Sequence, residues 1–99
     1  MEKITVVKAE PGKAPEAVEI ENDLKTLQKM VEGYIEGHQL PGTPFMLFVN
    51  EEGRMRGLPL NRRLNNFAFR GTMVIVKVVG SENATMDENE VKKAKELLS

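Results

Sequence analysis

The stretch TMVIVKVV, Thr72–Val79, is the strongest run of β-branched and apolar residues in the chain, and the fold can be worked out from it in both directions. Runs of this kind favour strands and are typical of the middle of a sheet. Lys77 is the one charged residue in the run, so one face of the strand is expected to reach water or a partner near that end. We therefore place residues 72–79 in the centre of a sheet.

Four further segments carry strand patterns. Lys3–Lys8 (KITVVK) is almost continuously apolar, whereas Ala17–Glu21 (AVEIE) alternates with the period of a half-exposed strand. The sequence PGKAP between them indicates a hairpin connection. Phe45–Asn50 (FMLFVN) predicts a central strand. Residues 34–40 (YIEGHQL) are interpreted as a strand because glycines interrupt and precede them; the alternative is a longer helix.

Two helices are predicted. An amphipathic pattern at Asp23–Glu32 follows Asn22, a good N-cap, and ends before Gly33. Near the carboxyl end of the chain, Thr85 and Glu88 fit a capping box. The apolar stripe of this second helix comprises Val91, Ala94, Leu97 and Leu98.

A hairpin is expected after the predicted strand Phe45–Asn50. In residues 51–53 (EEG), Gly53 would supply the positive φ of a tight turn. Arg54–Leu58 (RMRGL) would then be the returning strand, and its alternation would place Arg54 and Arg56 on one face. Pro59 would end that strand, because proline has no N–H to donate to a ladder.

The remaining segments complete an α+β fold. Asn61–Asn66 (NRRLNN) has the length of one helical turn or a compact loop, and Ser81–Ala84 is expected to be a loop. The economical packing is a mainly antiparallel sheet of about five to six strands with two helices packed against it, both on one face. A chain of 99 residues is long enough for one core, so residues 1–99 are interpreted as a single domain.

Composition excludes several classes of protein. Hydrophobic residues make up 40% and charged residues 29%, as in ordinary globular domains. The chain has no cysteine, which excludes disulfides, thiolate nucleophiles and the usual zinc sites. The most apolar run, Phe45–Val49, is far shorter than a membrane span, and the start MEKITVVKAE lacks the apolar core of a signal peptide. We therefore expect a cytoplasmic protein without a membrane partner, a metal or a cofactor.

Charge is strongly segregated along the chain. Residues 53–81 hold all five arginines and Lys77 but no acidic residue, so this segment carries +6. The other 70 residues hold 8 of the 14 basic and all 15 acidic side chains, so they carry −7. Arginine has a rigid fork of donors that matches phosphate and carboxylate, so the segment is a candidate anion-binding surface. The alternative is that the arginines only pair with acids elsewhere in the fold.

The candidate ligand-binding residues lie within this arginine segment, and the ligand we expect is a nucleotide or a nucleic-acid phosphate. They are Arg54, Arg56, Asn61, Arg62, Arg63 and Arg70. For Asn61 a structural role is favoured over ligand contact, in which it caps the backbone amides of the two following arginines. Phe67 and Phe69 are interpreted as core residues, with base stacking as the alternative.

No constellation of residues points to catalysis. His38 is the only histidine and has no serine, cysteine or second histidine near it in sequence, so no catalytic residues are assigned. Hydrolysis by His38 with a glutamate is kept as a third alternative. The carboxylates of Glu51 and Glu52 are interpreted as solvent-exposed charges at a hairpin tip.

Several motifs together resemble a known family. A strand ending in EPG is followed by EIEN before a helix, then by GYIE, NEEGRMRGLPLNRRL and GTMVIV. The most specific part comprises Asn50, Glu51, Glu52, Gly53, Gly57, Leu58, Pro59, Asn61 and Arg62. Over nearly its whole length the chain resembles a small family known as a domain of unknown function, of the 3846 type.

The resemblance implies a biological setting and no chemistry. Members of that family occur in bacteriophages, plasmids and other mobile elements of bacteria. Blocking a host defence factor, sequestering a nucleotide signal and assisting DNA transfer are the roles that such a setting implies. The family brings no activity, cofactor or catalytic residue.

We interpret the protein as a non-enzymatic binding domain with an arginine-rich, anion-recognising surface. The alternative is a protein-interaction module or inhibitor that binds a host protein through the arginines or through an exposed sheet edge such as Ala17–Glu21. A concave pocket around Arg62 would favour a nucleotide, whereas a flat arginine face would favour a macromolecule.

Overall fold

The computed structural model describes residues 2–64 and 66–99, and its architecture is α+β, as predicted. The two helices are α1 (Leu24–Val31) and α2 (Glu88–Leu97). The strands are β1 (Lys3–Ala9), β2 (Glu16–Glu21), β3 (Ile35–Gln39), β4 (Phe45–Asn50), β5 (Leu60–Leu64), β6 (Phe67–Arg70), β7 (Met73–Val79) and β8 (Glu82–Ala84).

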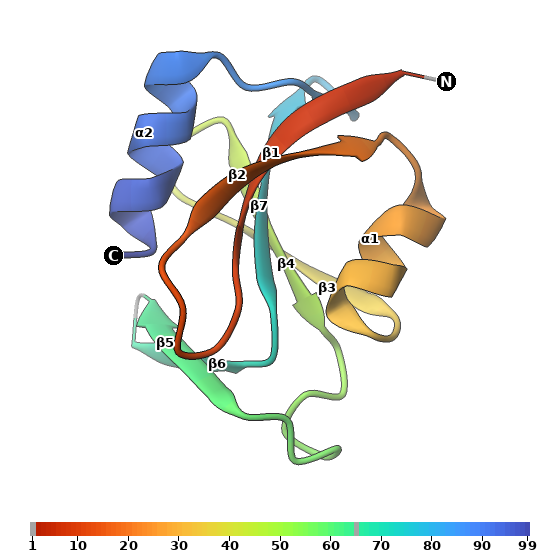
Figure 1. Ribbon diagram of the computed structural model, residues 1–99, viewed down its shortest axis with the longest axis vertical. Coiled ribbons are helices and arrows are strands. Elements are labelled where there is room, and N and C mark those ends of the chain that lie inside the picture. Colours follow the sequence, from red (N-terminus) through yellow and green to blue (C-terminus); the bar gives the residue numbers. More distant parts are fainter. Residues whose placement is uncertain (1, 65) are drawn as a thin grey trace.

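β7 lies at the centre of the main sheet, which confirms the prediction for residues 72–79 (Figure 1). The strand order is β2-β1-β7-β4-β3, and β8 pairs with the end of β7. Every pair is antiparallel, and Ile75 lies opposite Val7 on one side and Leu47 on the other. β5 and β6 form a separate two-stranded hairpin. The predicted strand at residues 34–40 is also confirmed, as β3.

The two helices cover opposite faces of the sheet, so the prediction that both lie on one face is wrong (Figure 1). Successive residues of a strand point to opposite faces, and the apolar run of β7 leaves neither face polar. Met73 and Ile75 pack in one core with α2 and the hairpin β5–β6. Val74 and Val76 pack in a second core with α1.

Helix α1 begins one residue later than predicted. Its N-cap is Asp23, whose Oδ1 accepts a hydrogen bond from the Thr26 N–H at 2.8 Å. Hydrogen bonds from Thr26 lower the pKa of the Asp23 carboxyl. Asn22, the predicted cap, instead donates from Nδ2 to Glu2 Oε1 at 2.9 Å. The helix ends at Glu32, which has a left-handed φ of 62°.

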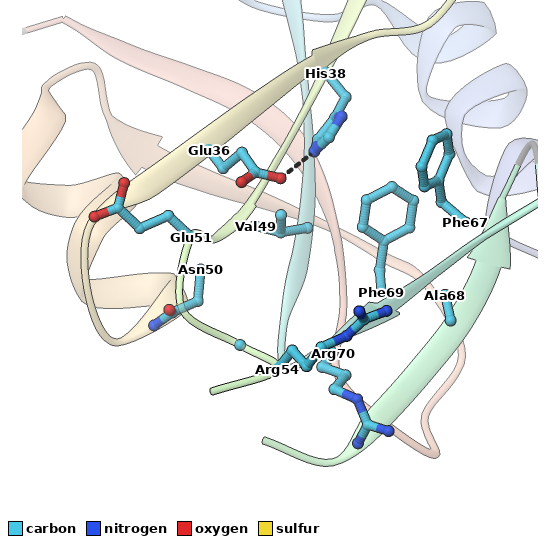
Figure 2. A pocket seen from close by; sticks show the side chains of 11 residues that line it. Glu36, His38, Val49, Asn50, Glu51, Arg54, Phe67, Ala68, Phe69 and Arg70 are labelled. Carbon is cyan, nitrogen blue, oxygen red and sulfur yellow. Dashed lines mark hydrogen bonds and ion pairs between the residues drawn. The ribbon is translucent and has the colours of Figure 1, made fainter. Parts of the chain in front are cut away.

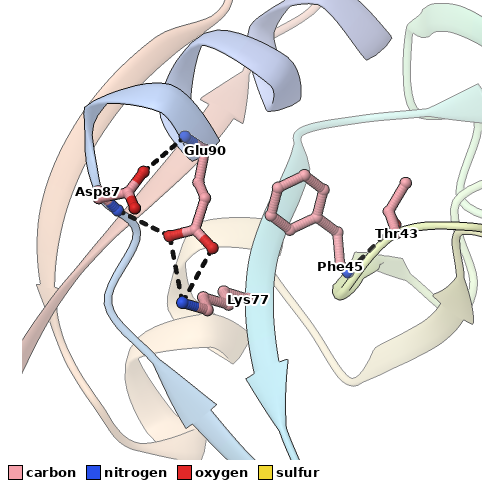
Figure 3. Close-up of polar contacts among 5 residues, drawn as sticks. All are labelled: Thr43, Phe45, Lys77, Asp87 and Glu90. Carbon is pink, nitrogen blue, oxygen red and sulfur yellow. Dashed lines mark hydrogen bonds and ion pairs between the residues drawn. The ribbon is translucent and has the colours of Figure 1, made fainter.

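Helix α2 is capped by Asp87 and Glu90 instead of the predicted Thr85 and Glu88 (Figure 3). The Asp87 side chain accepts from the Glu90 N–H, and the Glu90 side chain accepts from the Asp87 N–H. Thr85 is used elsewhere, since its Oγ1 accepts from the Thr5 N–H at 2.9 Å. The prediction of a capping box at the start of this helix is confirmed, but its position is two residues later than predicted.

Glu90 also explains the single charge in β7. Its Oε2 lies 2.9 Å from Lys77 Nζ, and both side chains are mostly buried (Figure 3). The hydrogen bond from the Asp87 backbone, and then the bond from Lys77, hold the pKa of the Glu90 carboxyl below its ordinary value. The face that was expected to meet water or a partner at Lys77 therefore meets α2.

The turn after β4 differs from the predicted hairpin and returning strand. Residues 51–57 form consecutive turns closed by bonds from the Arg56 N–H to Glu52 O and from the Leu58 N–H to Gly53 O, at 2.8 and 3.0 Å. Met55 is 85% exposed, so this segment has no apolar face to hold it in a sheet. Gly57, rather than Gly53, has the positive φ, at 66°.

Two other segments predicted as irregular form strands. Residues 61–64 belong to β5, not to a helical turn or loop, and Asn65 of the same prediction lies outside the described residues. β5 pairs with β6 in the register Leu64↔Phe67 and Arg63↔Ala68. Residues 82–84 form β8 instead of a loop.

Neither helix in residues 2–64 and 66–99 is long and apolar enough to cross a membrane.

Asn50 joins α1, β4 and the following turn, although it is a buried polar residue. Its Nδ2 donates to Val31 O at 2.9 Å and to Glu32 O at 3.2 Å, and its Oδ1 accepts from the Glu52 N–H at 2.7 Å. A β-carbon at position 33 would lie 2.6 Å from Asn50 Nδ2, so glycine is required there by close approach.

Replacing Asn50 by aspartate is expected to destabilise the fold by about 3 kcal/mol, because a carboxylate would face two carbonyl oxygens where an amide now donates. Urea unfolding measures the loss. The matched control is Asn89→Asp in the exposed first turn of α2, where a negative charge is favourable and stability should be unchanged or slightly raised. Equal effects of the two substitutions would contradict this role of Asn50.

Glu90→Gln is expected to lower stability at neutral pH by about 1 kcal/mol, the order found for capping groups. A lowered folded-state pKa stabilises the fold above the unfolded pKa, and this contribution is lost as the pH falls through the folded pKa. The difference from wild type should therefore be constant above about pH 4.5 and shrink below it. Thermal unfolding between pH 2.5 and 7 tests this, with Glu88→Gln in the same helical turn as control. A difference that does not change with pH would refute the assignment.

Candidate functional site

A cleft opens between the β3–β4 edge of the sheet, the 51–57 turn and β6 (Figure 2). Its volume is about 290 Å³. The cleft is on the face of the sheet that also carries α2, because its floor includes Val49 and Phe69 of that core. The lining residues are Glu36, His38, Val49, Asn50, Glu51, Gly53, Arg54, Phe67, Ala68, Phe69 and Arg70.

Two arginines from separate segments line one end of the cleft, and their guanidinium groups point in different directions (Figure 2). Gly53 brings the segments together, since it is buried and a β-carbon there would lie 3.2 Å from Arg70 O. Arg70 donates from Nη1 to Leu58 O at 3.1 Å. A guanidinium group has five N–H donors, so this one bond does not use them all. Arg54 is exposed, and its side chain forms no hydrogen bond or ion pair with the described part of the chain.

An acidic edge faces this basic end. Glu36 and His38 are two residues apart on β3, so both side chains lie on the cleft face, and Glu36 Oε2 is 2.6 Å from His38 Nε2 (Figure 2). The His38 ring stands edge-on to Phe69, with centroids 5.1 Å apart and an interplanar angle of 71°. Glu36 thus has a partner in the cleft. Glu51 contributes the other carboxylate of the lining.

The two phenylalanines of β6 have different environments. Phe69 is 8% exposed and belongs to the core, as predicted. Phe67 is 65% exposed, so the core interpretation is wrong for this residue. Its ring centroid is 6.3 Å from that of Phe69, which supports it from below without covering it. The lining of the cleft therefore includes one exposed aromatic side chain as well as two arginines.

Four of the predicted site residues donate hydrogen bonds to backbone carbonyls: Arg56, Asn61, Arg62 and Arg70. Arg56 Nη1 donates to Glu32 O at the end of α1. Arg62 donates from Nη2 to Lys13 O and from Nη1 to Asn61 Oδ1, each at 2.6 Å. Arg63 is exposed, and because it lies opposite Ala68 in the hairpin, it points to the face away from Phe67.

The alternative in which the arginines pair with acids is wrong for the described residues. Every ion pair in residues 2–64 and 66–99 involves a lysine or His38. Arg56, Arg62 and Arg70 instead donate hydrogen bonds to the backbone carbonyl oxygens of Glu32, Lys13 and Leu58, respectively. Their guanidinium groups fill a structural role that the charge pattern alone did not distinguish from ligand binding.

Asn61 also has a structural role, but a different one from the predicted cap. Its Nδ2 donates to Ala9 O at 2.7 Å and to Gly71 O at 2.8 Å. These bonds fasten the start of the hairpin β5–β6 to the end of β1 and to the residue after β6. Asn61 therefore holds one wall of the cleft in place without lining it.

The participation of Glu36 and His38 was not predicted. The signal was present, because residues 34–40 were interpreted as a strand and residues two apart on a strand share a face. Their proximity to the arginines depends on the packing of the hairpin, which no local pattern encodes. The part of the chain that the structure describes has no group of three His, Asp or Glu side chains suited to a metal ion.

Arg62→Ala is expected to lower stability by about 1–2 kcal/mol, because two charge-assisted hydrogen bonds are lost and Lys13 O is left unpaired. Arg54→Ala removes the same charge from an exposed position and should change stability by less than about 0.5 kcal/mol. Chemical unfolding of both variants is the test. If Arg54→Ala were the more destabilising substitution, the assignment of structural and free arginines would be reversed.

The chain was compared with known proteins. No curated protein and no solved structure matches it. Residues 4–99 match the family described as Domain of unknown function (DUF3846). The matched region contains both helices and every residue of the cleft, and the description of the family names no activity, substrate or cofactor. The family resemblance of the sequence is thereby confirmed, and the protein belongs to the DUF3846 family.

Proposed function

We propose that the protein is a small non-enzymatic domain that binds phosphate-bearing ligands, nucleotides or nucleic acids, at the Arg54–Arg70 end of the cleft. The observation that supports the proposal is that these two arginines, from separate segments, line one concave site. Arginine matches phosphate oxygens in pairs, and two guanidinium groups in a cleft hold an anion better than on a flat surface.

The proposal narrows the set of binding residues. A concave pocket around Arg62 would have favoured a nucleotide, but the cleft is lined by Arg54 and Arg70 and not by Arg62. Arg56, Asn61 and Arg62 are occupied by backbone carbonyls, so in this proposal they support the fold.

The electrostatics of the cleft favour an anion at one end. Glu36 is hydrogen-bonded to His38. Arg54 and Arg70 lie in a segment, residues 53–81, that has no acidic residue, and Glu51 and Glu52 directly precede it. An anion at this end would be attracted by both arginines. A cation in the cleft would have only Glu51 and Glu36, and Glu36 is already hydrogen-bonded to His38.

A protein-interaction module is the second candidate. The observation that favours it is the position of β2 at the edge of the main sheet, where a partner strand could pair. β2 also carries Glu16, Glu19 and Glu21, and charged edge strands are typical of proteins that avoid such pairing. The cleft is therefore the better supported site.

Thermal-shift titration with pyrophosphate, AMP, ATP and short single-stranded and duplex DNA and RNA tests the proposal. A ligand at 100 times its Kd should stabilise the protein by about 2.7 kcal/mol, which raises Tm by several degrees. Arg54→Ala should abolish the shift, because it removes half of the cationic end without touching the fold. The matched control is Arg63→Ala, which removes the same charge from an exposed position that does not line the cleft and should leave the shift intact.

Two results would overturn the proposal. The first is the absence of a shift with every phosphate compound in the titration, which would leave the β2 edge as the candidate surface. The second is an equal loss of the ligand-induced thermal shift in Arg54→Ala and Arg63→Ala, which would indicate a general effect of charge instead of a specific site.

A further inference from the structure

A second hollow adjoins the cleft on the far side of the aromatic residues. Its volume is about 350 Å³. His38, Phe67 and Phe69 line both hollows, so the two are neighbouring parts of one groove. The second hollow is completed by Gln39, Leu40, Pro41 and Leu64.

The two parts of the groove differ in chemistry. The first contains Arg54 and Arg70, whereas the second has apolar walls with one amide side chain, that of Gln39. Each hollow alone lies near the lower limit of small-molecule pockets, about 300 Å³. A ligand that fills both must be anionic at one end and flat or apolar at the other.

We propose that the groove binds single-stranded nucleic acid, with a backbone phosphate at Arg54 and Arg70 and the neighbouring base stacked on Phe67 in the apolar hollow. This inference rests on the phosphate-binding function proposed above and names its ligand. Every base has a π-face, and stacking on an exposed aromatic beside cationic groups is how single strands are held without sequence readout.

Phe67 is placed for this role by the hairpin. It is 65% exposed, and its ring lies 6.3 Å from that of Phe69 with a tilt of 41°, so much of the ring is accessible to a base. Phe67 and Arg70 are three residues apart on β6, about 10 Å along a strand, so alternation directs their side chains to opposite faces while both line the first hollow. A strand bound at both places must therefore span about that distance. The Gln39 amide both donates and accepts, as a base edge requires.

Single strands fit this groove better than duplexes. A base inside a duplex has both faces covered by its neighbours, so it has no free face for Phe67. Duplex binding also depends on a broad set of phosphate contacts, whereas this groove offers two arginines at one end. The affinity should therefore depend only modestly on salt. A plot of the logarithm of the association constant against the logarithm of the salt concentration should have a slope of about −0.7 for each phosphate contacted.

Fluorescence anisotropy with labelled hexanucleotides tests the inference. The probes are single-stranded DNA, single-stranded RNA, a duplex of the same sequence, and an abasic strand that keeps the phosphates but lacks the bases. We expect at least one of the two intact single strands to bind at least 10-fold more tightly than the abasic strand and the duplex. The DNA and RNA arms show which of the two sugars the groove accepts.

Phe67→Ala is the diagnostic variant and should weaken binding of that strand by about 5- to 150-fold, the equivalent of about 1–3 kcal/mol for one stacked base. Phe67→Leu keeps an apolar side chain but removes the π-face, so it should weaken binding too. The matched control is Tyr34→Ala, which removes an aromatic side chain with 67% exposure outside the groove and should have no effect.

The outcomes separate this inference from the function on which it rests. Equal binding of intact and abasic strands, with loss in Arg54→Ala, would leave the phosphate site standing and overturn the role of Phe67. Tighter binding of the duplex would also overturn the inference. No binding of any strand, together with no thermal shift by pyrophosphate or mononucleotides, would refute the phosphate-binding function itself.

Discussion

β7 is hydrogen-bonded to β1 on one side and to β4 on the other, and Met73, Val74, Ile75 and Val76 are completely buried. A strand that is apolar on both faces must be covered twice, and this requirement determines where the other elements lie. α1 covers one face, while α2 and the hairpin β5–β6 share the other. The cleft exists because the hairpin and α2 divide that second face between them instead of one element covering it all.

Sequence patterns predicted the elements whose residues are buried and failed where burial is slight. β1, β4 and β7 were evident because apolar residues repeat at strand spacing. The hairpin was missed because Asn61–Leu64 is polar and becomes a strand only by pairing with Phe67–Arg70. Helix starts were displaced by one or two residues, since Asn22, Asp23, Thr85 and Asp87 are all good caps and only packing decides among them.

Which of the candidate arginines line the cleft could not be predicted from the sequence. Arg54 and Arg70 do so. Local sequence could not show that the side chains of Arg56 and Arg62 bind backbone carbonyls while that of Arg54 binds none in the described chain. The reason is physical. Irregular turns leave carbonyl oxygens without ladder partners, and a guanidinium group satisfies them as readily as it binds phosphate. Charge pattern alone does not separate these uses.

The bond from Arg56 to Glu32 O gives the cleft a dependence on the opposite face of the sheet. It sets a positive charge at the carboxyl end of α1, where the helix dipole is negative. The same turn carries Arg54 into the cleft, and Asn50 ties its beginning to the same helix end. The end of α1 and the cleft are thus connected through one segment, the turn at residues 51–57. Any coupling free energy between the last turn of α1 and Arg54 that is transmitted through this turn acts equally in both directions.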